Sequence, residues 1–126
     1  MFEPRLGVWT DIRVTQQICN YELAESNETL KEFSYLIMLS STEIVEALAA
    51  LESLQKPEEV KSHSAEINRI YNLSIELQAK AVLDLFKTKD LLLIIKLKDI
   101  YEGLGRVMEK CNDVGHALND IAMSHA

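Results

Sequence analysis

Apolar residues recur every three or four positions along the last third of the chain, between Asp90 and His125. The steps alternate four and three, which is the spacing of residues on one face of an α-helix. No proline interrupts this stretch, and Asp90 stands where an N-cap would accept the first free backbone N–H groups. The pattern predicts a long helix over about 90–124, which needs partner helices to bury its stripe. The stripe comprises Leu93, Leu97, Ile100, Leu104, Val107, Cys111, Val114, Leu118 and Ile121.

The chain before residue 90 predicts three more helices, over about 6–23, 28–54 and 57–87. Pro57 suits the first position of a helix, because its missing N–H would find no partner there anyway. Short connections between helices favour antiparallel neighbours. We therefore expect an all-α fold, an antiparallel up-down-up-down four-helix bundle, that forms one domain over residues 1–126. The apolar stripe of the helix over 28–54 comprises Leu30, Phe33, Ile37, Ile44, Leu48, Leu51 and Leu54.

The helix predicted over 57–87 carries two adjacent apolar stripes, which indicates contact with two neighbouring helices. One stripe comprises Val60, Ile67, Ile70, Leu73 or Ser74, Leu77 and Ala81, and the other comprises Tyr71, Ile75, Val82 and Phe86.

Composition and charge narrow the class of function. The formal net charge is −7 and no cluster of Lys and Arg offsets it, which disfavours nucleic-acid binding. Cys19 and Cys111 lie far apart without a CxxC pattern and read as reduced thiols of a cytoplasmic protein. The longest strongly apolar run, over 91–95, is too short to cross a bilayer, so we expect no membrane insertion. The first residues lack the basic start and apolar centre of a signal peptide.

Motifs for catalysis are missing from the sequence: it has no nucleophile motif, phosphate loop or zinc pattern. We therefore expect no catalytic residues and no cofactor. Asp113 and His116 stand three positions apart and could share one metal, but a solvated helix face explains the pair better. An alternative is an all-α, magnesium-dependent nucleotide pyrophosphatase, since such enzymes hold magnesium with acidic pairs. Its two Glu-x-x-Glu pairs would be Glu22, Glu25, Glu43 and Glu46.

The segment from Lys98 to Leu118 reads KDIYEGLGRVMEKCNDVGHAL and resembles the PhoU-like phosphate-uptake regulators. The similar branch is the one that often accompanies low-affinity inorganic phosphate transporters. Segments 66–70 and 83–86 also match a stretch of that family. The positions of its pattern that this chain keeps are Lys98, Ile100, Tyr101, Leu104, Cys111, Asp113 and Val114.

The resemblance implies a bundle of about six helices, of which this chain would supply the last four. The family's signature is an acidic residue followed four positions later by Asp, which places two carboxylates on one helix face for an iron or zinc cluster. Here that motif is degraded, so the resemblance implies a lost metal site. Carboxylates remain at Asp11 and Glu109, and they are lost at Gly7, Tyr71, Ile75 and Gly105.

We expect the former carboxylate face at Tyr71 and Ile75 to pack as apolar core. Gly103 and Gly105 would then let the Tyr71 ring lie close to the last helix. Two missing helices would also leave apolar surface uncovered, which predicts a homodimer.

The resulting functional hypothesis is a non-enzymatic PhoU-like regulatory or accessory protein, linked to phosphate transport. It would act by protein–protein contact with a membrane phosphate transporter or a signalling protein. A second alternative, beside the pyrophosphatase, is a structural helical bundle that self-associates.

Overall fold

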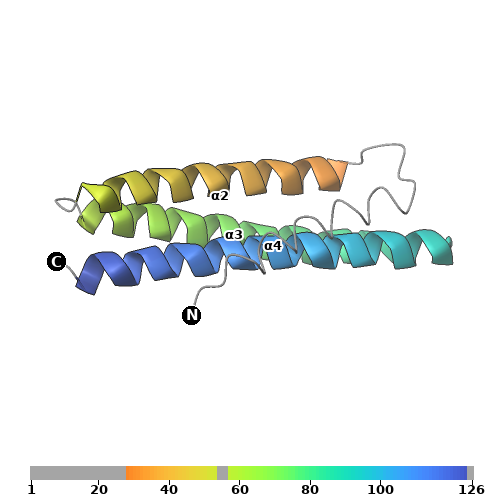
Figure 1. Ribbon diagram of the computed structural model, residues 1–126. Coiled ribbons are helices and arrows are strands. Elements are labelled where there is room, and N and C mark those ends of the chain that lie inside the picture. The colour runs from red at the N-terminus through yellow and green to blue at the C-terminus, as the bar shows by residue number, and fades with distance from the viewer. Residues whose placement is uncertain (1–27, 54–56, 125–126) are drawn as a thin grey trace.

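The computed structural model describes residues 28–53 and 57–124, and these fold into three helices without a strand. The helices are α2 (Glu28–Glu52), α3 (Pro57–Leu85) and α4 (Leu91–Ser124). They lie side by side, and each runs antiparallel to the next along the chain (Figure 1). The all-helical class is thus confirmed for this part of the chain, and each predicted bound lies within two residues of the observed one. The helix predicted over 6–23 lies outside the described residues.

The two predicted helix starts are confirmed in atomic detail. Pro57 is the first residue of α3. Asp90 precedes α4, and its carboxylate Oδ1 accepts a hydrogen bond of 3.2 Å from the backbone N–H of Leu93. These local signals fix where α3 and α4 begin, because a helix start leaves backbone N–H groups unpaired: Pro57 has no N–H to leave unpaired, and Asp90 accepts a hydrogen bond from one of them.

The core follows the line where the three helices meet. One cluster is centred on Phe33 of α2, Ile70 of α3, and Ile100 and Met108 of α4, all at most 1% exposed. The Phe33 ring stacks on that of Tyr101, with the ring centroids 6.3 Å apart. A second cluster, at the end where α2 passes into α3, is built mainly from smaller side chains: Ala47, Ala50, Val60, Leu118 and Ala122.

Most of the predicted α4 stripe is buried, but its last position is wrong. Ile121 is exposed and Ala122 faces inward instead. A pattern with a period of 3.5 drifts against a helix of 3.6 residues per turn, so the stripe leaves the core near the end of a long helix. The buried members are Leu97, Ile100, Leu104, Val107 and Leu118, and the half-buried ones are Leu93, Cys111 and Val114.

Two other predicted core positions also face solvent. Leu48 of α2 is exposed, because Ala47 and Ala50 take the inward positions of that turn. Phe86 of the second stripe, directly after the end of α3, is 58% exposed, and where the sequence left Leu73 or Ser74 open, Ser74 is the buried residue.

The outer side of α2 is unusually apolar for a surface. By length and composition alone α2 could span a membrane, and 17% of its most apolar window is buried. Its exposed apolar side chains are Tyr35, Met38, Val45 and Leu48.

Candidate functional site

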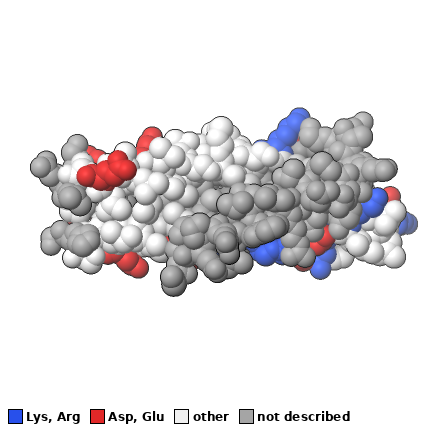
Figure 2. All heavy atoms as spheres, in the orientation of Figure 1, with Lys and Arg blue, Asp and Glu red and all other residues white. Residues whose placement is uncertain are grey.

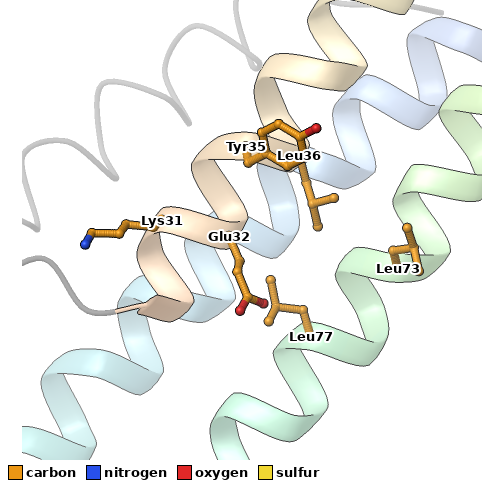
Figure 3. A pocket seen from close by; sticks show the side chains of 6 residues that line it. All are labelled: Lys31, Glu32, Tyr35, Leu36, Leu73 and Leu77. Atoms are coloured by element: carbon orange, nitrogen blue, oxygen red, sulfur yellow. The ribbon is translucent and has the colours of Figure 1, made fainter.

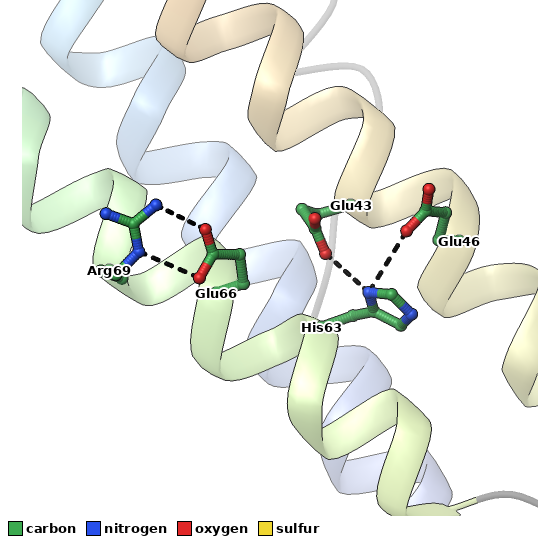
Figure 4. Close-up of polar contacts among 5 residues, drawn as sticks. All are labelled: Glu43, Glu46, His63, Glu66 and Arg69. Carbon is green, nitrogen blue, oxygen red and sulfur yellow. Dashed lines mark hydrogen bonds and ion pairs between the residues drawn. The ribbon is translucent and has the colours of Figure 1, made fainter.

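Glu43 and Glu46 of α2 meet His63 of α3 near the end of the bundle where α2 passes into α3. The His63 Nδ1 atom lies 2.6 Å from Glu43 Oε2 and 3.5 Å from Glu46 Oε2 (Figure 4). The side chains of Glu43 and His63 are mostly buried, at 22% and 25% exposure, whereas that of Glu46 is about half exposed. The three residues thus form a cluster that joins two helices, with one side open to solvent.

This cluster offers two carboxylate oxygens and one imidazole nitrogen, all within 4.8 Å of one another. That donor set suits a metal such as zinc, with its fourth position open, better than magnesium, which prefers oxygen ligands throughout. The 2.6 Å contact between His63 and Glu43 also has a purely structural meaning, since it is a strong hydrogen bond that ties α2 to α3.

A third carboxylate, that of Glu66 on the same helix as His63, is directed elsewhere. Arg69 Nε donates to Glu66 Oε2 at 2.9 Å, and Nη2 donates to the other carboxylate oxygen (Figure 4). This hydrogen bonding by Arg69 holds the pKa of Glu66 below its usual value. Glu66 therefore stays ionised and paired on the surface of α3 and adds no ligand to the cluster.

A shallow pocket of about 320 Å³ adjoins the cluster, between the end of α2 and the start of α3. Its rim includes Glu46, Glu59, His63 and Ser53. Acidic side chains gather at this end of the molecule (Figure 2), so cations would be attracted here rather than anions.

The positions that correspond to the family's metal motif on α3 and α4 lie together. Tyr71, Ile75, Gly105 and Glu109 all line one pocket of about 280 Å³ between these helices. Arg106 also lines it, and a guanidinium there opposes the binding of a metal cation.

The expected packing at this pocket is wrong for one of the two α3 residues. Ile75 is 48% exposed and so is not core. The Tyr71 ring is half-buried and packs against the core cluster, but the space over Gly105 is taken by Gln78. A Cβ atom at Gly105 would lie 2.1 Å from Gln78 Oε1. The glycine therefore admits a polar side chain of α3, because an amide tolerates this half-open site better than an aromatic ring would.

An apolar groove of about 440 Å³ runs between α2 and α3 near the start of α2 (Figure 3). Leu36, Leu73 and Leu77 line its length, and Tyr35 stands over its edge next to Lys31 and Glu32. The groove continues into the outer side of α2, so Tyr35 belongs to both surfaces.

The turn between α3 and α4 forms an apolar and basic tip, which we define as residues 83–96. Large side chains in the last turn of α3 and the first turns of α4 are 58–70% exposed. Lys87 and Lys89 lie in the turn between them, where Lys87 pairs with Asp84 at 3.3 Å, and the same end of the molecule shows uncharged atoms with both basic and acidic ones beside them (Figure 2). The exposed apolar residues of the tip are Leu83, Phe86, Leu91, Leu92 and Ile95.

The other predicted site residues divide in two. Four of them lie outside the described residues: Gly7, Asp11, Glu22 and Glu25. One acidic pair of the pyrophosphatase hypothesis, Glu22 and Glu25, is therefore not described. Asp113 and His116 are both exposed on α4, as expected for a solvated face.

The sequence patterns do not predict that His63 meets Glu43 and Glu46. A signal was present, because residues equally far from a short connection lie side by side in an antiparallel helix pair, and Glu46 and His63 lie about equally far from the connection between α2 and α3.

Comparison of the chain with protein-family models, with curated proteins and with solved structures gives no match.

Proposed function

We propose that this protein is a non-enzymatic, PhoU-like regulatory or accessory protein that acts by contact with a membrane phosphate transporter on its cytoplasmic side. The proposal includes a fourth helix over about 6–23, which completes an antiparallel four-helix bundle. The observation that supports contact with a membrane protein is the exposed apolar surface of the tip. The resemblance of residues 98–118 to phosphate-uptake regulators is the reason for proposing that the transported ion is phosphate.

The tip suits a partner embedded in a membrane. Large apolar side chains at 58–70% exposure are costly to leave in water, and an apolar patch of this kind marks an interaction site. The tip holds three lysines and two aspartates, and Lys87 pairs with Asp84 at 3.3 Å, so a small excess of positive charge would face the anionic headgroups around a transporter. Since the rest of the protein is acidic, such a surface would draw this end of the bundle, rather than its other surfaces, towards the membrane.

The test is phosphate uptake by cells of the source organism that lack this chain. We expect uptake of labelled phosphate to change on deletion and to be restored by the wild type. The double variant Leu91→Glu/Leu92→Glu should fail to restore it while keeping the helical circular dichroism of the wild type. Met123→Glu is the matched control, because Met123 is an exposed apolar residue at the opposite end of α4. Unchanged uptake on deletion would refute the phosphate link, and full rescue by the double variant would refute the role of the tip.

Nucleotide hydrolysis is the second candidate, because Glu43 and Glu46 bring two carboxylates together on α2; the His63 imidazole beside them makes the cluster a poorer site for magnesium. We expect no pyrophosphate release from nucleoside triphosphates and magnesium beyond that of a Glu43→Gln/Glu46→Gln variant. Turnover that requires both glutamates would replace the regulatory proposal with the enzymatic one.

A further inference from the structure

The outer face of α2 has nearly the same pattern when it is read from either end. Its centre line carries Lys31, Met38, Val45 and Glu52, each seven residues from the next and all exposed. The midpoint of this line falls between residues 41 and 42. Met38 and Val45 are equally far from the midpoint, and so are Lys31 and Glu52. A face of this kind can pair with a copy of itself that runs in the opposite direction.

The flanks of the centre line show the same relation, with a large residue opposite a small one. Tyr35 on one flank would meet the small Ala49 of the partner subunit, and Leu48 on the other flank would meet Ser34 of the partner subunit. Ser41 and Thr42 stand at the middle, where small side chains let two helices approach closely. Large-against-small contacts are the means by which helix surfaces interlock without voids.

We propose that α2 pairs with α2 of a second copy in an antiparallel dimer, whose two-fold axis passes between Ser41 and Thr42. Such an interface is isologous, since the same patch is used by both subunits. The end charges favour one direction: the antiparallel pair places Lys31, which lies 3.3 Å from Glu28 of its own helix, opposite Glu52 of the partner subunit. A parallel pair would place lysine against lysine and glutamate against glutamate, which is unfavourable.

This inference goes beyond the proposed role in phosphate transport and does not depend on it. It assigns the dimer to α2, which leaves the tip free for the transporter. Two other occupants compete for the α2 face: the helix proposed over 6–23, which an antiparallel bundle places beside α2, and a lipid bilayer, because α2 is apolar and long enough to span one. α2 packs against both α3 and α4, so a bilayer would meet only its outer side, which favours a protein partner there.

Cysteine cross-linking tests the pairing, in the full chain with Cys19→Ser and Cys111→Ser as background. Thr42→Cys should form an intersubunit disulfide under mild oxidation, because the two copies of position 42 lie next to the axis and within the short reach of such a bond. Met38→Cys alone should not, since its two copies lie roughly 10 Å apart along the helices at 1.5 Å per residue. Met38→Cys mixed with Val45→Cys should again give a disulfide, between one copy of each. Leu83→Cys, equally exposed but on α3, gives the background of random collisions.

The expected result is a cross-linked fraction for Thr42→Cys, and for the mixture, several-fold above that of Leu83→Cys. Efficient cross-linking of Met38→Cys alone would overturn the antiparallel arrangement in favour of a parallel one. A 14.3 kDa species by sedimentation at tens of micromolar, without any Thr42→Cys cross-link, would overturn the dimer. Flotation of the wild type with phospholipid vesicles, abolished by Val45→Glu, would assign the face to lipid. None of these outcomes bears on the uptake experiment, so the two proposals fail separately.

Discussion

At the scale of single residues, Ser40 of α2 is the clearest misfit. Its side chain is fully buried, and its Oγ atom has no hydrogen-bond partner among the described residues. A buried hydroxyl without a partner destabilises the folded state, because it has lost the hydrogen bonds that it makes to water in the unfolded chain. Ser40→Ala should therefore raise the free energy of unfolding by about 1 kcal/mol, measured by urea denaturation. Ser74→Ala is the control, since buried Ser74 donates a 2.6 Å hydrogen bond to the Tyr71 carbonyl and its removal should bring no gain.

The glycines at 105 and 115 of α4 should respond differently to alanine. Each substitution gains about 1 kcal/mol of helix propensity. At Gly105 the new methyl group meets the end of the flexible Gln78 side chain, which can turn away into the adjoining pocket. At Gly115 it meets the buried Ile67 at 3.1–3.4 Å, where there is less room to move. We expect Gly105→Ala to stabilise and Gly115→Ala to be neutral or destabilising in thermal unfolding, and the reverse order would contradict the packing described here.

At the scale of the elements, the position of Leu104 tests whether the α4 stripe is a true core. Leu104 is 7% exposed within the main cluster. Leu104→Ala should lower the free energy of unfolding by ~2–5 kcal/mol. Leu92→Ala, on the exposed side of the same helix, should cost less than ~1 kcal/mol. Similar losses for the two variants in chemical denaturation would mean that the stripe does not face the core.

Much of this helical arrangement can be predicted from sequence, because its causes are local. Pro57 and Asp90 mark helix starts by their own chemistry, and the apolar spacing of α4 requires only a helix. Which of Ala47 and Leu48 faces inward depends instead on how closely α2 approaches its neighbours. The meeting of His63 with Glu43 depends on the register of two helices, and the filling of Gly105 by Gln78 depends on a single rotamer. Such features belong to tertiary packing, which no single helix pattern encodes.

At the scale of the whole molecule, the expectation that this protein lacks a PhoU-like metal cluster can be tested by metal content. The pocket that holds Gly105 and Glu109 also holds Arg106, and a multinuclear site needs several convergent carboxylates. Protein purified without chelator should carry far less than one equivalent of iron or zinc by elemental analysis, and Glu109→Gln should not change it. Zinc that does bind should be lost with His63→Ala, because the cluster of Glu43, Glu46 and His63 is the better donor set. Near-stoichiometric metal that disappears with Glu109→Gln would show that the pocket with Gly105 and Glu109 does bind a metal.

The tip lies at one end of an elongated bundle, and this position determines how far apart the two tips of a dimer lie. α4 has 34 residues and thus spans about 50 Å at 1.5 Å per residue. In the antiparallel pair, the two tips point away from each other at opposite ends. The pair would then be a bivalent spacer that fits two docking points separated by roughly that span. A transporter array with this repeat would hold the spacer by avidity, whereas an isolated transporter would engage only one end and release it sooner.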